Sequence, residues 1–136
     1  MIQTRKEKRP GSLAEVARLV NQGTPSVMAV CEFLDEFYAA DPLVKPLMLA
    51  DEPEPLQLKD DREAIVKNAY FSAVAEMLAY RHGITAPSWI FQKKFFLENP
   101  WFATDIQGLW PLLLAESPVF FRRRNLFVSA NALSRA

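Results

Sequence analysis

The chain has 136 residues, of which 50% are hydrophobic and 24% charged, and its 16 basic and 16 acidic residues give no net charge. This length suits one domain, and this composition is typical of a soluble globular protein. The lack of net charge argues against a partner held electrostatically over the whole surface, such as duplex DNA bound only through its phosphates.

The first expected helix covers residues 12–21. Ser12 and Glu15 have the spacing of a capping box, in which each side chain accepts a hydrogen bond from the other residue's backbone N–H. Apolar residues follow at helical spacing, and Gly23 suits the left-handed conformation that commonly ends a helix.

A second helix is expected over residues 25–40, with Thr24 as its N-cap and Pro25 in its first turn. Its apolar residues recur at steps of three and four and so predict one buried stripe. This stripe comprises Val27, Val30, Cys31, Leu34, Phe37 and Tyr38. The position of Cys31 on the stripe favours a small buried hydrophobe over a reactive thiol.

A short helix is expected within residues 41–48, followed by a proline-rich acidic loop at 51–55. The longest helix is expected over 61–82, with Asp60 or Asp61 as its cap. Its predicted buried stripe comprises Ile65, Val66, Ala69, Tyr70, Ala73, Val74, Met77 and Leu78. Whether the acidic residues at 51–61 pair with basic groups elsewhere is open.

After Gly83 the pattern changes to short elements separated by proline. These are a short helix that begins at Pro87, a tight turn at Asn99–Phe102, helices at 105–115 and 117–124, and a strand-like triplet at 126–128. The residues expected to point inward are Phe91, Phe95, Phe96, Leu109, Leu112 and Leu113.

These elements predict an all-α fold, a compact single-domain helical bundle of about three longer helices plus several short ones. The domain is expected to span residues 1–136, with 1–10 as a flexible arm and a break between two sub-blocks near Gly83. No run of about 18 apolar residues occurs, so no membrane span is expected.

Strong catalytic signatures are absent. The single Cys31 and the single His82 form neither an internal disulfide nor a Cys/His metal set, and no glycine-rich phosphate loop or nucleophile elbow occurs. We therefore expect a non-enzyme without metal or cofactor. The lone cysteine and the absence of a secretory signal pattern favour a reducing, cytoplasmic setting.

The sharpest polar feature is the arginine triplet Arg122, Arg123 and Arg124. Consecutive helical residues point about 100° apart, so one arginine is expected to pair with an acid while the others are solvated, unless the triplet binds a partner. Trp89 follows Pro87 and is expected to be a partly exposed interface anchor, with Phe91 beside it. The candidate partner-binding residues are Trp89, Phe91, Arg122, Arg123 and Arg124.

Residues 86–136 combine the motifs APSW (86–89), NPWF (99–102), ESP (116–118) and FRRRNLFVSANALSRA (121–136). This combination resembles the C-terminal part of a family of small uncharacterised bacterial proteins that are antitoxin-like or regulator-like. The resemblance implies a protein partner, often nucleotidyltransferase-like. Some members also carry a helix-turn-helix ahead of this segment, but the second helix of this chain presents Glu32, Asp35 and Glu36 where a recognition helix needs basic or amide side chains.

Two hypotheses follow. The first is a helical protein-interaction domain, antitoxin-like or an accessory subunit, that binds a protein partner or a second copy of itself. The alternative is a nucleic-acid-binding transcriptional regulator that uses basic termini, and it requires those termini to converge on one face. These basic residues are Arg5, Lys6, Lys8, Arg9 and the arginine triplet. A third, weaker hypothesis is an enzyme that uses His82 and carboxylates from separate helices, which requires a cleft at His82.

Overall fold

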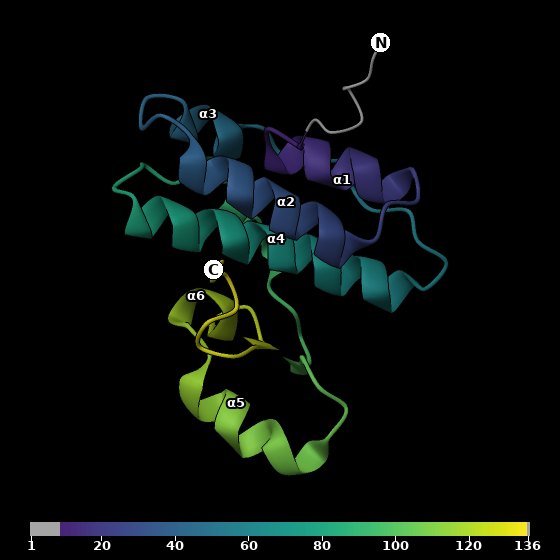
Figure 1. Ribbon diagram of the computed structural model, residues 1–136. Coiled ribbons are helices and arrows are strands. Elements are labelled where there is room, and N and C mark those ends of the chain that lie inside the picture. Colours follow the sequence, from purple (N-terminus) through teal and green to yellow (C-terminus); the bar gives the residue numbers. More distant parts are fainter. Residues whose placement is uncertain (1–8, 136) are drawn as a thin grey trace.

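The computed structural model describes residues 9–135 and shows a mostly helical chain (Figure 1), which confirms the predicted helical class. The α-helices are α1 (Leu13–Asn21), α2 (Ser26–Ala39), α3 (Lys45–Ala50), α4 (Asp61–Arg81), α5 (Trp110–Glu116) and α6 (Val119–Arg122). Three 3-10 helices, η2 (Ser88–Phe91), η3 (Lys93–Phe95) and η4 (Gln107–Leu109), and two short strands, β1 (Trp101–Phe102) and β2 (Leu126–Phe127), complete the described chain.

Local capping explains where α1 and α4 begin and end. Ser12 Oγ accepts a hydrogen bond from Glu15 N at 3.1 Å, and the Glu15 carboxylate accepts one from Gly11 N, one residue earlier than an ideal capping box. The Asp60 carboxylate caps α4 by accepting from two backbone N–H groups of its first turn. Gly83 has a φ of 67°, so it ends α4 as predicted.

The start and the buried face of α2 differ from the prediction. Pro25 occupies the N-cap position and no side chain caps the helix, so Thr24 does not act as its cap. Val27 is exposed, and Phe33 is fully buried instead. The buried face is still one stripe, but it is rotated around the helix from the predicted one because α2 packs against α1. The buried residues of α2 are Ala29, Val30, Phe33, Leu34 and Phe37.

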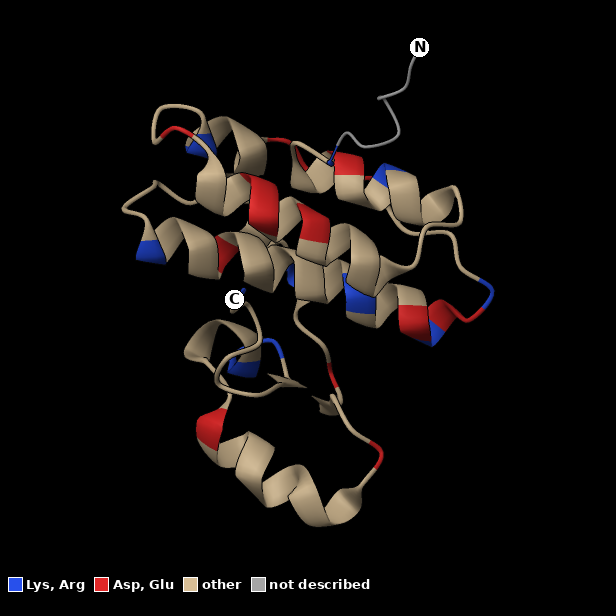
Figure 2. Cartoon of the chain, viewed as in Figure 1, with Lys and Arg blue, Asp and Glu red and all other residues tan. Residues whose placement is uncertain are grey.

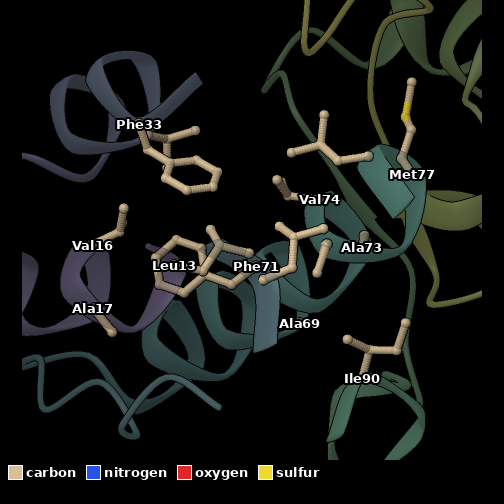
Figure 3. Close-up of a cluster of buried hydrophobic side chains, with 14 of the residues drawn as sticks. Leu13, Val16, Ala17, Phe33, Ala69, Phe71, Ala73, Val74, Met77 and Ile90 are labelled. Atoms are coloured by element: carbon tan, nitrogen blue, oxygen red, sulfur yellow. The ribbon is translucent and has the colours of Figure 1, made fainter. Parts of the chain in front are cut away.

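Helix α4 is the central element of the fold. Figure 1 shows α1, α2 and α3 on one side of it and the C-terminal segment on the other, so its residues from Phe71 to Ala79 are all buried. Near its start the helix has only one covered side, and for this reason Ile65 is exposed, contrary to the predicted stripe. Figure 3 shows Leu13 of α1, Phe33 of α2 and Phe71 of α4 in the same interior.

The C-terminal segment, residues 84–135, is built from short helices and two short strands. Strands β1 and β2 pair in parallel, with Trp101 opposite Leu126 and Phe102 opposite Phe127. Helix α5 projects away from α4 (Figure 1) and buries only Leu113. The expectation that Leu109 and Leu112 point inward is therefore wrong, because no element within residues 9–135 covers them.

The predicted flexible arm at residues 1–10 lies mostly outside the described residues. Of its last two residues, Pro10 is buried and the Arg9 guanidinium lies 3.9 Å from the Glu36 carboxylate on α2. None of the helices between residues 9 and 135 is long and apolar enough to cross a membrane.

Candidate protein-interaction surface

Arg124 is the largest fully buried side chain of the described residues, with none of its surface exposed. Its guanidinium donates to Ser72 Oγ at 2.7 Å, Glu76 Oε1 at 2.6 Å, and the carbonyl oxygens of Phe120 at 2.8 Å and Ile90 at 2.9 Å. Burial lowers the pKa of Arg124, and hydrogen bonding to the Glu76 carboxylate opposes that shift. Arg124 therefore attaches the C-terminal segment to α4 and has no surface left for a partner.

The other two arginines of the triplet differ from each other: Arg123 shares the Glu76 carboxylate with Arg124, so two arginines pair with an acid where the sequence predicts one, because the helix ends at Arg122. Arg123 Nη1 donates to Glu76 Oε2 at 2.9 Å, so both oxygens of this carboxylate bind arginine. Arg122 Nη2 donates to the Ser117 carbonyl at 2.7 Å. Both Arg122 and Arg123 are exposed, so their predicted role in partner binding stays a prediction, whereas the buried Arg124 is structural.

The two aromatic candidates for partner binding also differ in exposure, since one is buried and the other is exposed. Trp89 is 7% exposed, and its indole Nε1 donates to the Leu49 carbonyl at 3.0 Å. The expectation that Trp89 is partly exposed is therefore wrong, because its polar atom binds backbone inside the fold. Phe91 is 51% exposed, contrary to its expected inward position, and remains available at the surface.

The acidic loop does not bind the arginine triplet through either of its two glutamates. Glu52 accepts hydrogen bonds from Lys94 Nζ at 2.9 Å and Gln92 Nε2 at 2.8 Å. Glu54 accepts from Asn21 Nδ2 at 2.7 Å. The loop is thus held against η3 and α1, while Glu76 of α4 supplies the carboxylate for the triplet.

The basic termini are bound to acidic residues of α2. Arg9 lies at Glu36, and Arg135 forms two hydrogen bonds with the Asp35 carboxylate, at 2.8 and 3.1 Å. The Arg135 guanidinium lowers the pKa of Asp35. The two described ends of the chain therefore meet at neighbouring acids of α2, and both terminal arginines are paired there, whereas Arg123 and Arg124 bind Glu76 of α4. The remaining basic residues of the nucleic-acid hypothesis, Arg5, Lys6 and Lys8, lie outside the described residues.

A groove of about 920 Å³ runs between α2, the first half of α4 and the C-terminal segment. Its apolar lining includes Val27, Val30, Leu34, Val66, Phe71 and Val128. Charged side chains of α4, including Arg62 and Lys67, also line it. The volume lies at the upper end of the roughly 300–1,000 Å³ typical of ligand pockets, so the groove has room for several aliphatic side chains.

Cys31 lines this groove and is half-buried, so it is more accessible than the sequence indicated. Tyr70 lies near it on α4, and burial raises the pKa of the Tyr70 hydroxyl. Arg135 of the C-terminal segment also lines this groove. The groove thus carries apolar, aromatic and charged side chains from three segments that are far apart in the sequence.

A second feature is an exposed apolar surface at α5, which we call the α5 patch. It comprises Ile106 at 62%, Leu109 at 44%, Leu112 at 55% and Leu114 at 48% exposure. The sequence has no charged residue from 106 to 115, and Figure 2 shows α5 as an almost wholly uncharged helix. Several exposed aliphatic side chains within one short uncharged stretch make it a candidate interaction site.

His82, the residue of the enzymatic hypothesis, lies at the end of α4 beside two aromatic rings. Its ring centroid is 5.1 Å from that of Phe37 and 5.9 Å from that of Tyr38. Desolvation lowers the pKa of His82, and the positive charges of Lys45 and Arg81 lower it further. His82 does not line the groove, and no cluster of metal-ligating side chains occurs between residues 9 and 135.

No protein-family model matches the chain, and no curated protein and no solved structure matches it either.

Proposed function

We propose that this chain is a helical protein-interaction domain, an antitoxin-like or accessory subunit that binds a protein partner through the α5 patch. We infer that its framework is a compact helical bundle in which α4 is central. The sequence resemblance supports a bacterial origin, and the lone Cys31 supports a cytoplasmic setting. The proposal depends on one observation, the exposure of four aliphatic side chains on and beside a projecting, uncharged helix.

The packing of α5 supports this proposal. Trp110 stacks on Phe102 with ring centroids 4.3 Å apart, and its indole Nε1 donates to the Thr104 carbonyl at 3.0 Å. Leu113 is buried from the other side. Helix α5 is thus held in place while Leu112 and Leu114 are exposed, which preorganises apolar side chains at little entropic cost on binding.

Affinity capture from the native cells, with the intact chain as bait, tests the proposal. We expect a stoichiometric protein partner that is lost with the Leu109→Glu/Leu112→Glu variant, because charges within an apolar contact remain unpaired and desolvated. The matched control is Leu43→Glu/Leu47→Glu, which changes two exposed leucines away from α5 and should retain the partner.

Two results would contradict this function. One is equal retention of the partner by both double variants, which would place the contact elsewhere on the surface. The other is co-purification of nucleic acid in place of protein, removed by salt, which would favour the transcriptional regulator.

A further inference from the structure

An aromatic and basic surface lies where α6 packs against the end of α4. The ring centroids of Tyr80 and Phe120 are 5.3 Å apart, and the Arg123 guanidinium carbon lies 5.7 Å from the centroid of Phe120. We call these three side chains the Tyr80 ledge. Tyr80 is 75% exposed, and Arg123 is exposed as well. The ledge therefore presents an aromatic ring and a guanidinium to solvent, side by side with a third flat group between them.

The ion pairs at the ledge leave it with excess positive charge. The Glu76 carboxylate binds Arg123 and also the buried Arg124, so two guanidiniums share one negative charge. The two stretches of sequence that contain the ledge, 77–97 and 117–136, have no acidic residue. No second carboxylate from either stretch is therefore available to balance the charge.

Helix α6 adds a further positive charge beside the ledge. Arg122 is exposed and takes part in none of the ion pairs formed within residues 9–135. Figure 2 shows basic and no acidic colour on α6 itself. The acid that precedes α6 in the sequence, Glu116, accepts a hydrogen bond from Ala130 N. The surface thus suits a ligand that carries both negative charge and a flat apolar group.

We propose that the Tyr80 ledge binds single-stranded nucleic acid, with a base stacked on the Tyr80 ring and phosphates bound by Arg122 and Arg123. Proteins that bind single strands combine aromatic rings, on which bases stack, with basic side chains that follow the backbone. The guanidinium fork also matches the geometry of phosphate oxygens. This function goes beyond the proposed one, because it uses none of the side chains of the α5 patch.

The ledge fits a single strand better than a duplex or an acidic protein segment. The chain has no net charge, so phosphate contacts alone would hold a duplex weakly, and bases inside a duplex are not free to stack on Tyr80. Carboxylates of a protein would satisfy the guanidiniums but offer no flat ring to the exposed tyrosine. A nucleotide carries both a flat base and an anionic phosphate.

Fluorescence anisotropy with a labelled oligothymidine of about 12 nucleotides, within the usual range of site sizes, tests this site. We expect saturable binding at low salt that weakens as the salt concentration rises. Tyr80→Ser should weaken binding about ten-fold, and Tyr80→Phe should retain it, because the ring provides the stacking surface. Arg123→Gln should also weaken binding, and it should fold because Glu76 keeps Arg124 as a partner.

Two variants and two other probes serve as controls. Phe91→Ser and Arg62→Gln change an exposed aromatic residue and an exposed arginine outside the ledge, so both should bind as the intact chain does. A duplex of the same length and an abasic strand with the same phosphates should bind more weakly than the oligothymidine. Circular dichroism melting of each variant shows that loss of binding is not loss of fold.

Three results would overturn the proposal. The first is an unchanged anisotropy at protein concentrations on the order of tens of micromolar. The second is binding of the duplex or the abasic strand as tight as that of the oligothymidine, since phosphates alone would then account for it. The third is tighter binding of a labelled glutamate–tyrosine copolymer, which would make the ledge a protein contact. The Leu109→Glu/Leu112→Glu variant should bind the oligothymidine normally, so these results leave the proposed function of the α5 patch untouched.

Discussion

Arg124 and Glu76 form the interaction on which the C-terminal segment depends most. The Arg124 side chain is fully buried and that of Glu76 is 9% exposed, so each depends on the other for its charge: the carboxylate binds Arg124 and Arg123, and the Arg124 guanidinium has donors directed at four separate acceptors. The Arg124 guanidinium also lies 4.6 Å from the ring centroid of Phe96. Removal of one member leaves the remaining buried polar groups without partners.

We therefore expect Arg124→Ala to lower the free energy of unfolding by about 3–5 kcal/mol, the cost of breaking a buried ion pair. Arg122→Ala is the matched control, because its exposed guanidinium makes one hydrogen bond with a backbone carbonyl, and it should lower stability by less than about 1 kcal/mol. Urea unfolding followed by circular dichroism measures both. Similar losses in the two variants would contradict the structural role of Arg124.

His82 makes stability depend on pH near neutrality. Its pKa is lowered in the folded chain, so the folded state binds its proton less readily than the unfolded state does. The contribution is present above the unfolded pKa of about 6.5 and is lost as the pH falls through the lower folded pKa. We expect a small fall in Tm between pH 7.5 and pH 5.5, with a flatter profile for His82→Gln. His82 is the only histidine. If the variant shows the same fall in Tm, that fall comes from other titratable groups.

At the scale of elements, α5 contains adjacent leucines in opposite environments. Leu113 is buried against the rest of the C-terminal segment, and Leu112 is exposed. We expect Leu113→Ala to lower the free energy of unfolding by about 2–5 kcal/mol, and Leu112→Ala to change it by less than about 0.5 kcal/mol. Denaturant unfolding of the pair checks this, and equal losses would show that another element covers Leu112.

The ends of helices with local capping signals were predictable from the sequence, whereas the side of each helix that is buried was not. Ser12, Asp60 and Gly83 set the ends of α1 and α4 through bonds and backbone angles that involve only nearby residues. Which side of α2 or α5 is buried depends on neighbours that arrive from distant segments. For this reason Val27 and Leu112 were assigned to the interior and are exposed.

At the scale of the whole molecule, acidic and basic blocks of the sequence pair within the fold. Asp35 and Glu36 bind opposite ends of the described chain, and Glu52 binds Lys94 of η3. The uneven charge was visible in the sequence, but the partners were not, since the acidic loop and the arginine triplet bind other segments. The groove could not be predicted either, because residues from three distant segments form its walls.

The separation of Glu76 and Arg124 by 48 positions has a consequence for synthesis on the ribosome. When α4 has left the exit tunnel, Ser72 and Glu76 are already on the chain, but Arg124, which donates to the Ser72 hydroxyl and neutralises the Glu76 carboxylate, has not been made. Until Arg124 has been made, this side of α4 therefore stays in contact with water. Arg124 follows Glu76 by 48 positions, so the native interior on this side of α4 closes only after that later segment has been made, and not when α4 itself emerges.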